Sequence, residues 1–131
     1  MTNSTLPSVE TQWVSEIDRA SVVFAGVRFR IARLSFSRRV DLARRVRDLA
    51  QRIEFLDAGG SVQERLASAV LAHEIDRVYA EWGLLGVEGL TIDSEAATAV
   101  SLLERGPVAL VAEIVAAIKQ ECGLSDEERK N

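Results

Sequence analysis

The stretch from Ser37 to Trp82 reads SRRVDLARRVRDLAQRIEFLDAGGSVQERLASAVLAHEIDRVYAEW, and its apolar spacing predicts two long helices. In the first half, apolar residues recur every four or three positions, which is the period of one helix face: Leu42, Val46, Leu49, Ile53 and Leu56. Gly59-Gly60 can end this helix, and Ser61 with Glu64 has the spacing of a capping box. We expect antiparallel helices over about residues 37–57 and 61–82, the first capped by Ser37.

The second helix contains two sets of apolar residues, and we expect both to face inward: Val62, Leu66 and Val70, followed by Leu71, Ile75, Val78 and Trp82. The outer face of the first helix is basic, with Arg38, Arg44, Arg45, Arg47 and Arg52. Asp41 and Asp48 stand four residues before Arg45 and Arg52, where pairs within the helix offset part of the repulsion.

The N-terminal region predicts extended structure. Residues 1–12 are polar and read as a flexible arm, and Trp13, Val14 and Ile17 have the spacing of one helical turn. From Val22 to Leu34 the pattern changes to period two, with Val27, Phe29 and Ile31 on one face and Arg28 and Arg30 on the other. A β-hairpin over residues 22–33, turning at Ala25-Gly26, is expected.

Beyond Trp82, three glycines among apolar residues predict a loop over residues 83–91 that packs on the core. Asp93 or Ser94 can cap a helix over 94–105, and Gly106-Pro107 ends it and begins another over 107–122. Residues 125–131 form a polar tail, in which Ser125 and Glu128 repeat the capping-box spacing. The expected fold is mainly α: an N-terminal β-hairpin packed on a small bundle of about four helices, an α+β domain spanning residues 13–124.

Length and composition agree with a single soluble domain. A chain of 131 residues can bury roughly two thirds of its unfolded surface. The lone Cys122 has no disulfide partner within the chain, which indicates a reducing compartment such as a cytoplasm. Apolar runs stay short of the roughly 18 residues that cross a bilayer, and the polar start lacks signal-peptide features. We expect an intracellular protein that does not bind membranes.

Charge is divided unevenly along the chain. Ten arginines lie between Arg19 and Arg52 against two aspartates, whereas the rest of the chain is acidic and the net charge is −4. These arginines can pair with carboxylates of the second half or of a neighbouring subunit, because the planar guanidinium binds carboxylates at two points. The alternative is a small nucleic-acid-binding or regulatory protein that uses the arginine-rich hairpin and helix.

Catalytic and metal-binding patterns are not recognisable in the sequence. His73 is the only histidine and Cys122 lies in a different predicted helix, so a nucleophile–base pair is not indicated. The acidic clusters at 74–76 and 126–128 lack the spacing of His or Cys ligands. Gly83, Gly86 and Gly89 follow a helix with a spacing of three, unlike a dinucleotide-binding loop. We expect no enzymatic activity, no metal and no cofactor.

The order of the parts resembles that of small phage and prophage tail assembly chaperones. Three segments carry the resemblance: FRIARLSF at residues 29–36, where the hairpin enters the basic helix, WGL at 82–84, and LSDEERKN at 124–131. Such proteins often begin with an extended segment, arginine, leucine and serine before a helix. They often finish with Leu-Ser, acidic residues and a basic-Asn end.

The resemblance implies a non-enzymatic, mostly helical protein in the cytoplasm of a bacterial host. It would self-associate, bind the tape-measure protein, and keep it soluble while tail-tube subunits polymerise around it. Candidate client-binding residues are Trp82, Leu84, Leu85, Val87 and Leu90. Candidate residues for self-association or for an anionic partner are Arg28, Arg30, Arg38, Arg44, Arg45 and Arg52, among which Arg38, Arg45 and Arg52 would face the acidic second half of another subunit.

Overall fold

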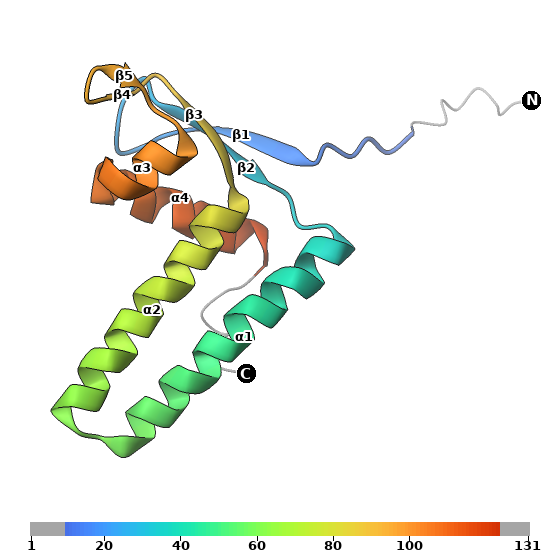
Figure 1. Cartoon of the computed structure of the whole chain (residues 1–131). Helices are drawn as coiled ribbons and strands as arrows, with labels where there is room; N and C mark the ends of the chain where they lie inside the picture. Colours follow the sequence, from blue (N-terminus) through green and yellow to red (C-terminus); the bar gives the residue numbers. More distant parts are fainter. Residues whose placement is uncertain (1–9, 124–131) are drawn as a thin grey trace, which may run out of the picture.

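The computed structural model describes residues 10–123, which form a small head and a projecting pair of helices (Figure 1). The fold is mainly helical with an N-terminal antiparallel hairpin, as expected. Its elements are β1 Glu16–Ala20, β2 Arg28–Ala32, α1 Phe36–Gly59, α2 Val62–Gly83, β3 Leu84–Glu88, β4 Thr91–Ile92, β5 Glu95–Ala96, α3 Ala99–Arg105 and α4 Val108–Glu121. Part of the predicted arm, residues 1–9, and the predicted tail lie outside the described residues.

Helices α1 and α2 form the antiparallel pair that the sequence predicts. Gly60 ends α1 in the left-handed conformation, with φ 76°, and both hydrogen bonds of the capping box between Ser61 and Glu64 are present. The N-cap of α1 is Ser35 rather than Ser37, and its hydroxyl accepts a hydrogen bond from the backbone N–H of Arg38. Ser35 has extended φ and ψ, so the chain is already helical at Phe36.

The N-terminal hairpin exists, but its first strand lies earlier than predicted. Strand β1 pairs with β2 from Glu16 opposite Ala32 to Ala20 opposite Arg28, where we expected a helical turn and then a strand at Val22. Val22 and Val23 lie instead in the connecting loop. The backbone N–H of Val22 donates a hydrogen bond of 2.6 Å to the carboxylate of Glu113 on α4. The β-branched pair therefore stays exposed, because a tertiary contact fixes the loop and overrides strand propensity.

The segment predicted as an apolar loop over 83–91 is largely a strand. Strand β3 adds antiparallel to β2, so that the sheet order is β1-β2-β3 and Val87 lies opposite Phe29. Gly89 ends this strand with φ 81°, and a Cβ there would overlap the carbonyl oxygen of Gly26. The three glycines favoured the prediction of a loop. Glycine also occurs within strands where another backbone approaches closely, as it does here.

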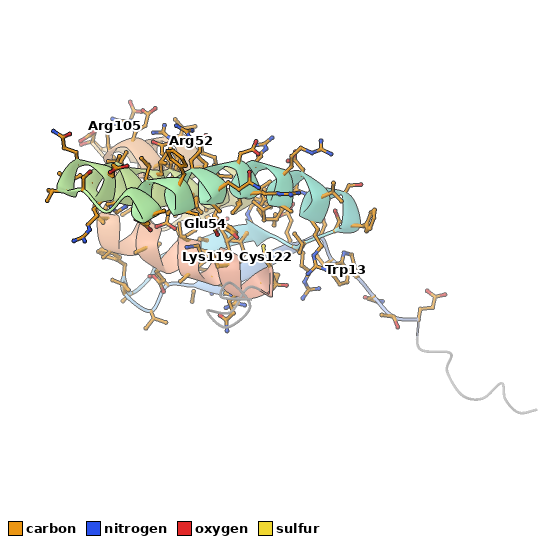
Figure 2. The ribbon with its side chains drawn as sticks, turned by 90° about the horizontal axis from the view of Figure 1, so that it is seen from below. Trp13, Arg52, Glu54, Arg105, Lys119 and Cys122 are labelled. Carbon is orange, nitrogen blue, oxygen red and sulfur yellow. The ribbon has the colours of Figure 1, made fainter. Side chains whose placement is uncertain are left out.

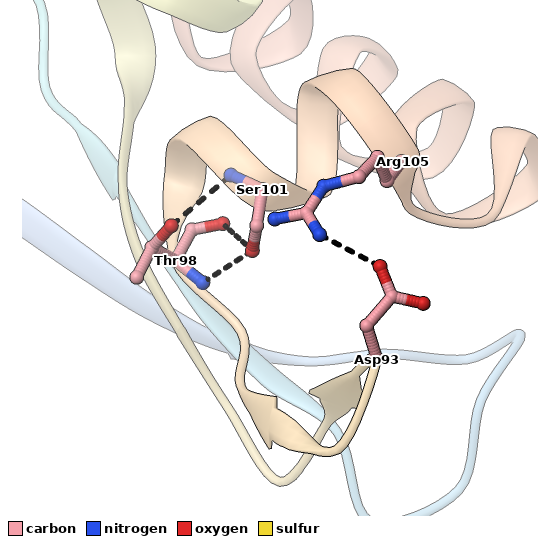
Figure 3. Close-up of polar contacts among 4 residues, drawn as sticks. All are labelled: Asp93, Thr98, Ser101 and Arg105. Atoms are coloured by element: carbon pink, nitrogen blue, oxygen red, sulfur yellow. Dashed lines mark hydrogen bonds and ion pairs between the residues drawn. The ribbon is translucent and has the colours of Figure 1, made fainter.

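A short hairpin and a short helix replace the predicted helix over 94–105. Asp93 and Ser94 have positive φ and form the turn between β4 and β5, instead of capping a helix. Thr98 caps α3, and it exchanges hydrogen bonds with Ser101 in a capping box (Figure 3). Arg105, at the end of α3, reaches back to Asp93 at 2.7 Å. Two residues with φ above zero favour a tight hairpin turn, which asparagine, aspartate and glycine adopt most readily.

Helix α4 provides the centre of the core. It begins after Pro107, which is the N-cap rather than the predicted first helical residue. Fully buried side chains from α4, α3 and β2 meet between the sheet and the end of α2: Ile31, Leu102, Leu110, Ile114 and Ile118. All of them belong to the head, and α1 contributes only Leu42 to the buried core.

Candidate protein-interaction surface

Arginines on the strands are paired within the chain. Arg28 contacts Asp18 at 3.3 Å and Arg30 contacts Glu16 at 2.9 Å, so β1 supplies both carboxylates. Glu121, at the end of α4, lies 3.8 Å from Arg19 and 3.3 Å from Arg33. The predicted neutralisation by the second half of the chain therefore applies to Arg19 and Arg33, while Arg28 and Arg30 pair locally.

The arginines of α1 fall into two groups. Arg45 pairs with Asp41 at 3.3 Å, and the guanidinium of Arg38 lies 5.5 Å from the centre of the Trp82 ring. Within residues 10–123, Arg39, Arg44, Arg47 and Arg52 have no carboxylate within 4.0 Å, although Asp48 stands four residues before Arg52. Among residues 10–123, the cations without a carboxylate within 4.0 Å therefore lie on α1, apart from Arg65 on α2.

The predicted client-binding residues lie mostly in the core. Leu84 is buried, and Trp82, Val87 and Leu90 are half-buried and pack against the head. Leu85 is the exposed member of the set, at 36%. Client contact through these residues stays a prediction, and their packing favours a structural role for most of them.

An apolar stripe that the sequence reasoning placed inside lies on the surface of α2. Val62, Leu66 and Val70 are 72%, 64% and 59% exposed, whereas Leu71 is buried and faces α1. Nine residues separate Val62 from Leu71, and at 3.6 residues per turn they point to opposite sides of the helix. Sequence could have revealed this, because Val70 and Leu71 are adjacent and cannot share one face.

The stripe leads into a groove between α2 and α4. This groove has a volume of about 850 Å³, and its apolar lining includes Ala80 of α2, Leu103 of α3, and Val111 and Val115 of α4. His73 and Arg77, which follow Val70 on the same face of α2, stand at its edge. Val62, Leu66, Val70, His73, Arg77 and Ala80 recur at helical spacing, so stripe and groove form one surface. We call it the α2–α4 surface.

Charges at the edge of the groove are neutralised within the chain. Lys119 binds Asp76 at 2.7 Å and Arg77 binds Glu81 at 2.8 Å. The Glu81 carboxylate also raises the pKa of the Arg77 guanidinium. Paired charges around an apolar floor favour an apolar partner over a phosphate backbone, which needs free cations.

Of the candidate reactive groups, Cys122 is buried and His73 is exposed. Burial, with a smaller contribution from Glu121, raises the pKa of the Cys122 thiol to about 11. Over residues 10–123, no three His, Cys, Asp or Glu side chains gather as a metal site would require. Among the helices of the same residues, none combines the length and the apolar character of a membrane span.

Comparison of the chain with protein-family models, with curated proteins and with solved structures found no match.

Proposed function

We propose that this chain is a non-enzymatic phage tail assembly chaperone that binds a helical segment of the tape-measure protein on the α2–α4 surface. The observation that carries the proposal is the continuity of the exposed stripe Val62, Leu66 and Val70 with the groove beside Ala80. Apolar side chains on the surface of a water-soluble helix have a free-energy reason to be covered by a partner.

The dimensions of this surface suit a helical client. Val62 and Ala80 are 18 residues apart in α2, so the surface is ~27 Å long at 1.5 Å per residue. A client helix with apolar residues every three or four positions would cover it in the manner of a helix in a groove. The identity of the client, and binding of tail-tube subunits, come from the resemblance of the sequence to tail assembly chaperones. The cytoplasm of a bacterial host is the matching location.

The test is co-expression with the long coiled-coil protein encoded nearest to this gene. We expect the wild-type chain to keep that protein soluble and to co-purify with it. Leu66→Glu with Val70→Glu should abolish co-purification, because two charges would be buried without partners. Ala72→Glu is the matched control, since Ala72 is exposed on α2 and no residue of the stripe stands three or four positions from it.

Circular dichroism must show that the variants keep the helical content of the wild type. Loss of binding in the stripe variant but not in Ala72→Glu supports the proposal. A wild-type chain that neither solubilises nor retains any long tail protein of its genome removes it.

A further inference from the structure

A groove separate from the α2–α4 surface lies between α1 and α2, beside the end of α4. It has a volume of about 390 Å³. Its apolar lining comes from the segment before α1, from both helices and from the end of α4: Leu34, Leu42, Val46, Ile75, Tyr79 and Cys122. Arg39 and Arg47 of α1 line it as well, and none of the residues 10–123 that line it is a carboxylate. This α1–α2 groove therefore joins an apolar floor to two cations.

Cations exceed anions around the α1–α2 groove in the described part of the chain. Arg39 and Arg47 have no carboxylate within 4.0 Å among residues 10–123. Glu121 lines a hollow next to the groove together with Arg39, but it is already paired with two arginines of the sheet region. Asp48 shares a shallow hollow on α1 with both arginines, lies more than 4.0 Å from them and does not line the groove. The groove therefore favours an apolar ligand that also carries negative charge.

Charge changes sign along the groove side of α1. Glu54 and Asp57 stand seven residues after Arg47 and Ala50, which both line the groove, so all four share one face of the helix. Figure 2 shows Glu54 on the side of α1 that faces α4, and Arg52 on the opposite side. Among residues 10–123, neither Glu54 nor Asp57 has a cation within 4.0 Å. A ligand that follows this face therefore meets cations first and carboxylates further along.

The sequence that follows α4 has the complementary order. Residues 124–131 read LSDEERKN, which is an apolar residue, then three acidic residues, then two basic residues. Gly123, immediately before them, lines the same hollow as Arg39 and Cys122 at the edge of the groove. The sequence thus places an apolar residue, acids and bases, in that order, directly after a residue that stands beside the groove.

We propose that residues 124–131 bind in the α1–α2 groove of their own chain and follow α1 toward its end at Gly59. In this arrangement Leu124 contacts the apolar floor. Residues 126–128 supply carboxylates to Arg39 and Arg47, and residues 129–130 supply cations to the acidic part of the same face.

The length of the segment suits this path. Glu54 stands 15 residues after Arg39, which is ~22 Å along the helix at 1.5 Å per residue. Lys130 is seven residues from Gly123, and seven extended residues span up to ~25 Å. The basic pair can therefore reach the level of Glu54 while the acidic residues pass the two arginines.

The α2–α4 surface is a second apolar site within reach, because Gly123 lines its groove too. Its cations Lys119 and Arg77 are already paired with Asp76 and Glu81. Binding there would leave residues 126–128 without cations, so charge complementarity favours the α1–α2 groove.

An acidic segment of another protein would find the same features in the groove. Residues 124–131 have the advantage of covalent attachment at its edge, which gives a short linked segment an effective concentration in the millimolar range. The contact does not rest on the proposed client binding, because it uses a different groove and leaves the α2–α4 surface open.

Paramagnetic relaxation enhancement on the full chain tests the proposal. A nitroxide is attached at Asn131→Cys at pH 7, where Cys122 does not compete, because burial raises the pKa of its thiol to about 11. We expect strong broadening of the backbone amide signals of residues 47–57, and no broadening at Leu110 or Ile92 in the head.

Charge reversal shows whether the arginines hold the segment. Arg39→Glu with Arg47→Glu should abolish the broadening, because it places like charges opposite residues 126–128. Adding Asp126→Lys and Glu128→Lys to this variant restores opposite charges and should restore most of the broadening.

Arg44→Glu with Arg52→Glu is the matched control. It makes the same charge change in the same helix, on exposed residues that do not line the α1–α2 groove, and it should leave the broadening unchanged. Circular dichroism must show that every variant keeps the helical content of the wild type.

Several results would overturn the proposal: no broadening on α1, broadening at Val111 and Val115 of the α2–α4 surface instead, an equal loss in the control variant, or no rescue by the lysines. A mixture of spin-labelled chain and ¹⁵N-labelled chain without the nitroxide tests for contact between molecules, and broadening there would also overturn it. Client co-purification is measured on the Arg39→Glu, Arg47→Glu variant and should be unchanged, so that failure of either proposal is seen separately.

Discussion

At the scale of single residues, the arginines divide into those that hold the strands in register and those that remain available. Arg28 and Arg30 pair with carboxylates diagonally across the β1–β2 ladder, since their direct neighbours in register are Ala20 and Asp18. Each such exposed pair contributes at most about 1 kcal/mol. Their value lies in specificity, because a slip of one residue would turn the arginines toward the core. Arg44 and Arg47 have no such role in the described chain.

Cys122 provides a prediction at this scale. Its thiol is 4% exposed, and burial raises its pKa to about 11. Alkylation by iodoacetamide at pH 8 should be roughly a hundredfold slower in the folded protein than in urea, because only the thiolate reacts. The protonated thiol is favoured in the fold, so its contribution to stability is complete below the ordinary thiol pKa and is lost as pH rises toward 11. Equal alkylation rates in the folded and unfolded protein would contradict this.

At the scale of the elements, the long helices and strand β2 were predictable because local signals agree there, whereas strands β1 and β3 were not. The boundary at Gly59, Gly60 and Ser61 combines a glycine stop with a capping box, and both are local. Strand β3 has no such signal, because its pairing with β2 joins residues far apart in sequence. For the exposed stripe of α2, spacing is enough to separate Val70 from Leu71, but it does not show which of the two faces is buried. Spacing shows which residues share a face, but what lies against that face depends on the tertiary fold.

The two faces of α2 give a second prediction. Leu71→Ala should lower the free energy of unfolding by about 2–4 kcal/mol, because it removes buried methyl groups and leaves a cavity. Leu66→Ala should change it by less than about 0.5 kcal/mol, since that side chain is 64% exposed and surface substitutions have small effects. Urea denaturation followed by circular dichroism measures both. Similar losses in the two variants would mean that the stripe is buried in the free protein.

At the scale of the whole molecule, the core and the candidate binding surfaces lie in different places. The fully buried side chains belong to the head, in β2, α3 and α4. The outer part of the helical pair has no buried residue between Leu42 and Ser68, and it carries Phe55, Val62 and Leu66 on its surface. The buried core is therefore concentrated at one end, whereas exposed apolar side chains occur at both ends, among them Val22, Val100 and Val108 in the head.

This division predicts the pattern of amide hydrogen exchange. Local opening requires less free energy where few apolar contacts are lost, so amides of residues 50–66 should exchange faster than those of Ile114 and Ile118 by at least about a hundredfold. Uniform protection along both helices at low concentration would show instead that the projecting pair is as stable as the head without a partner.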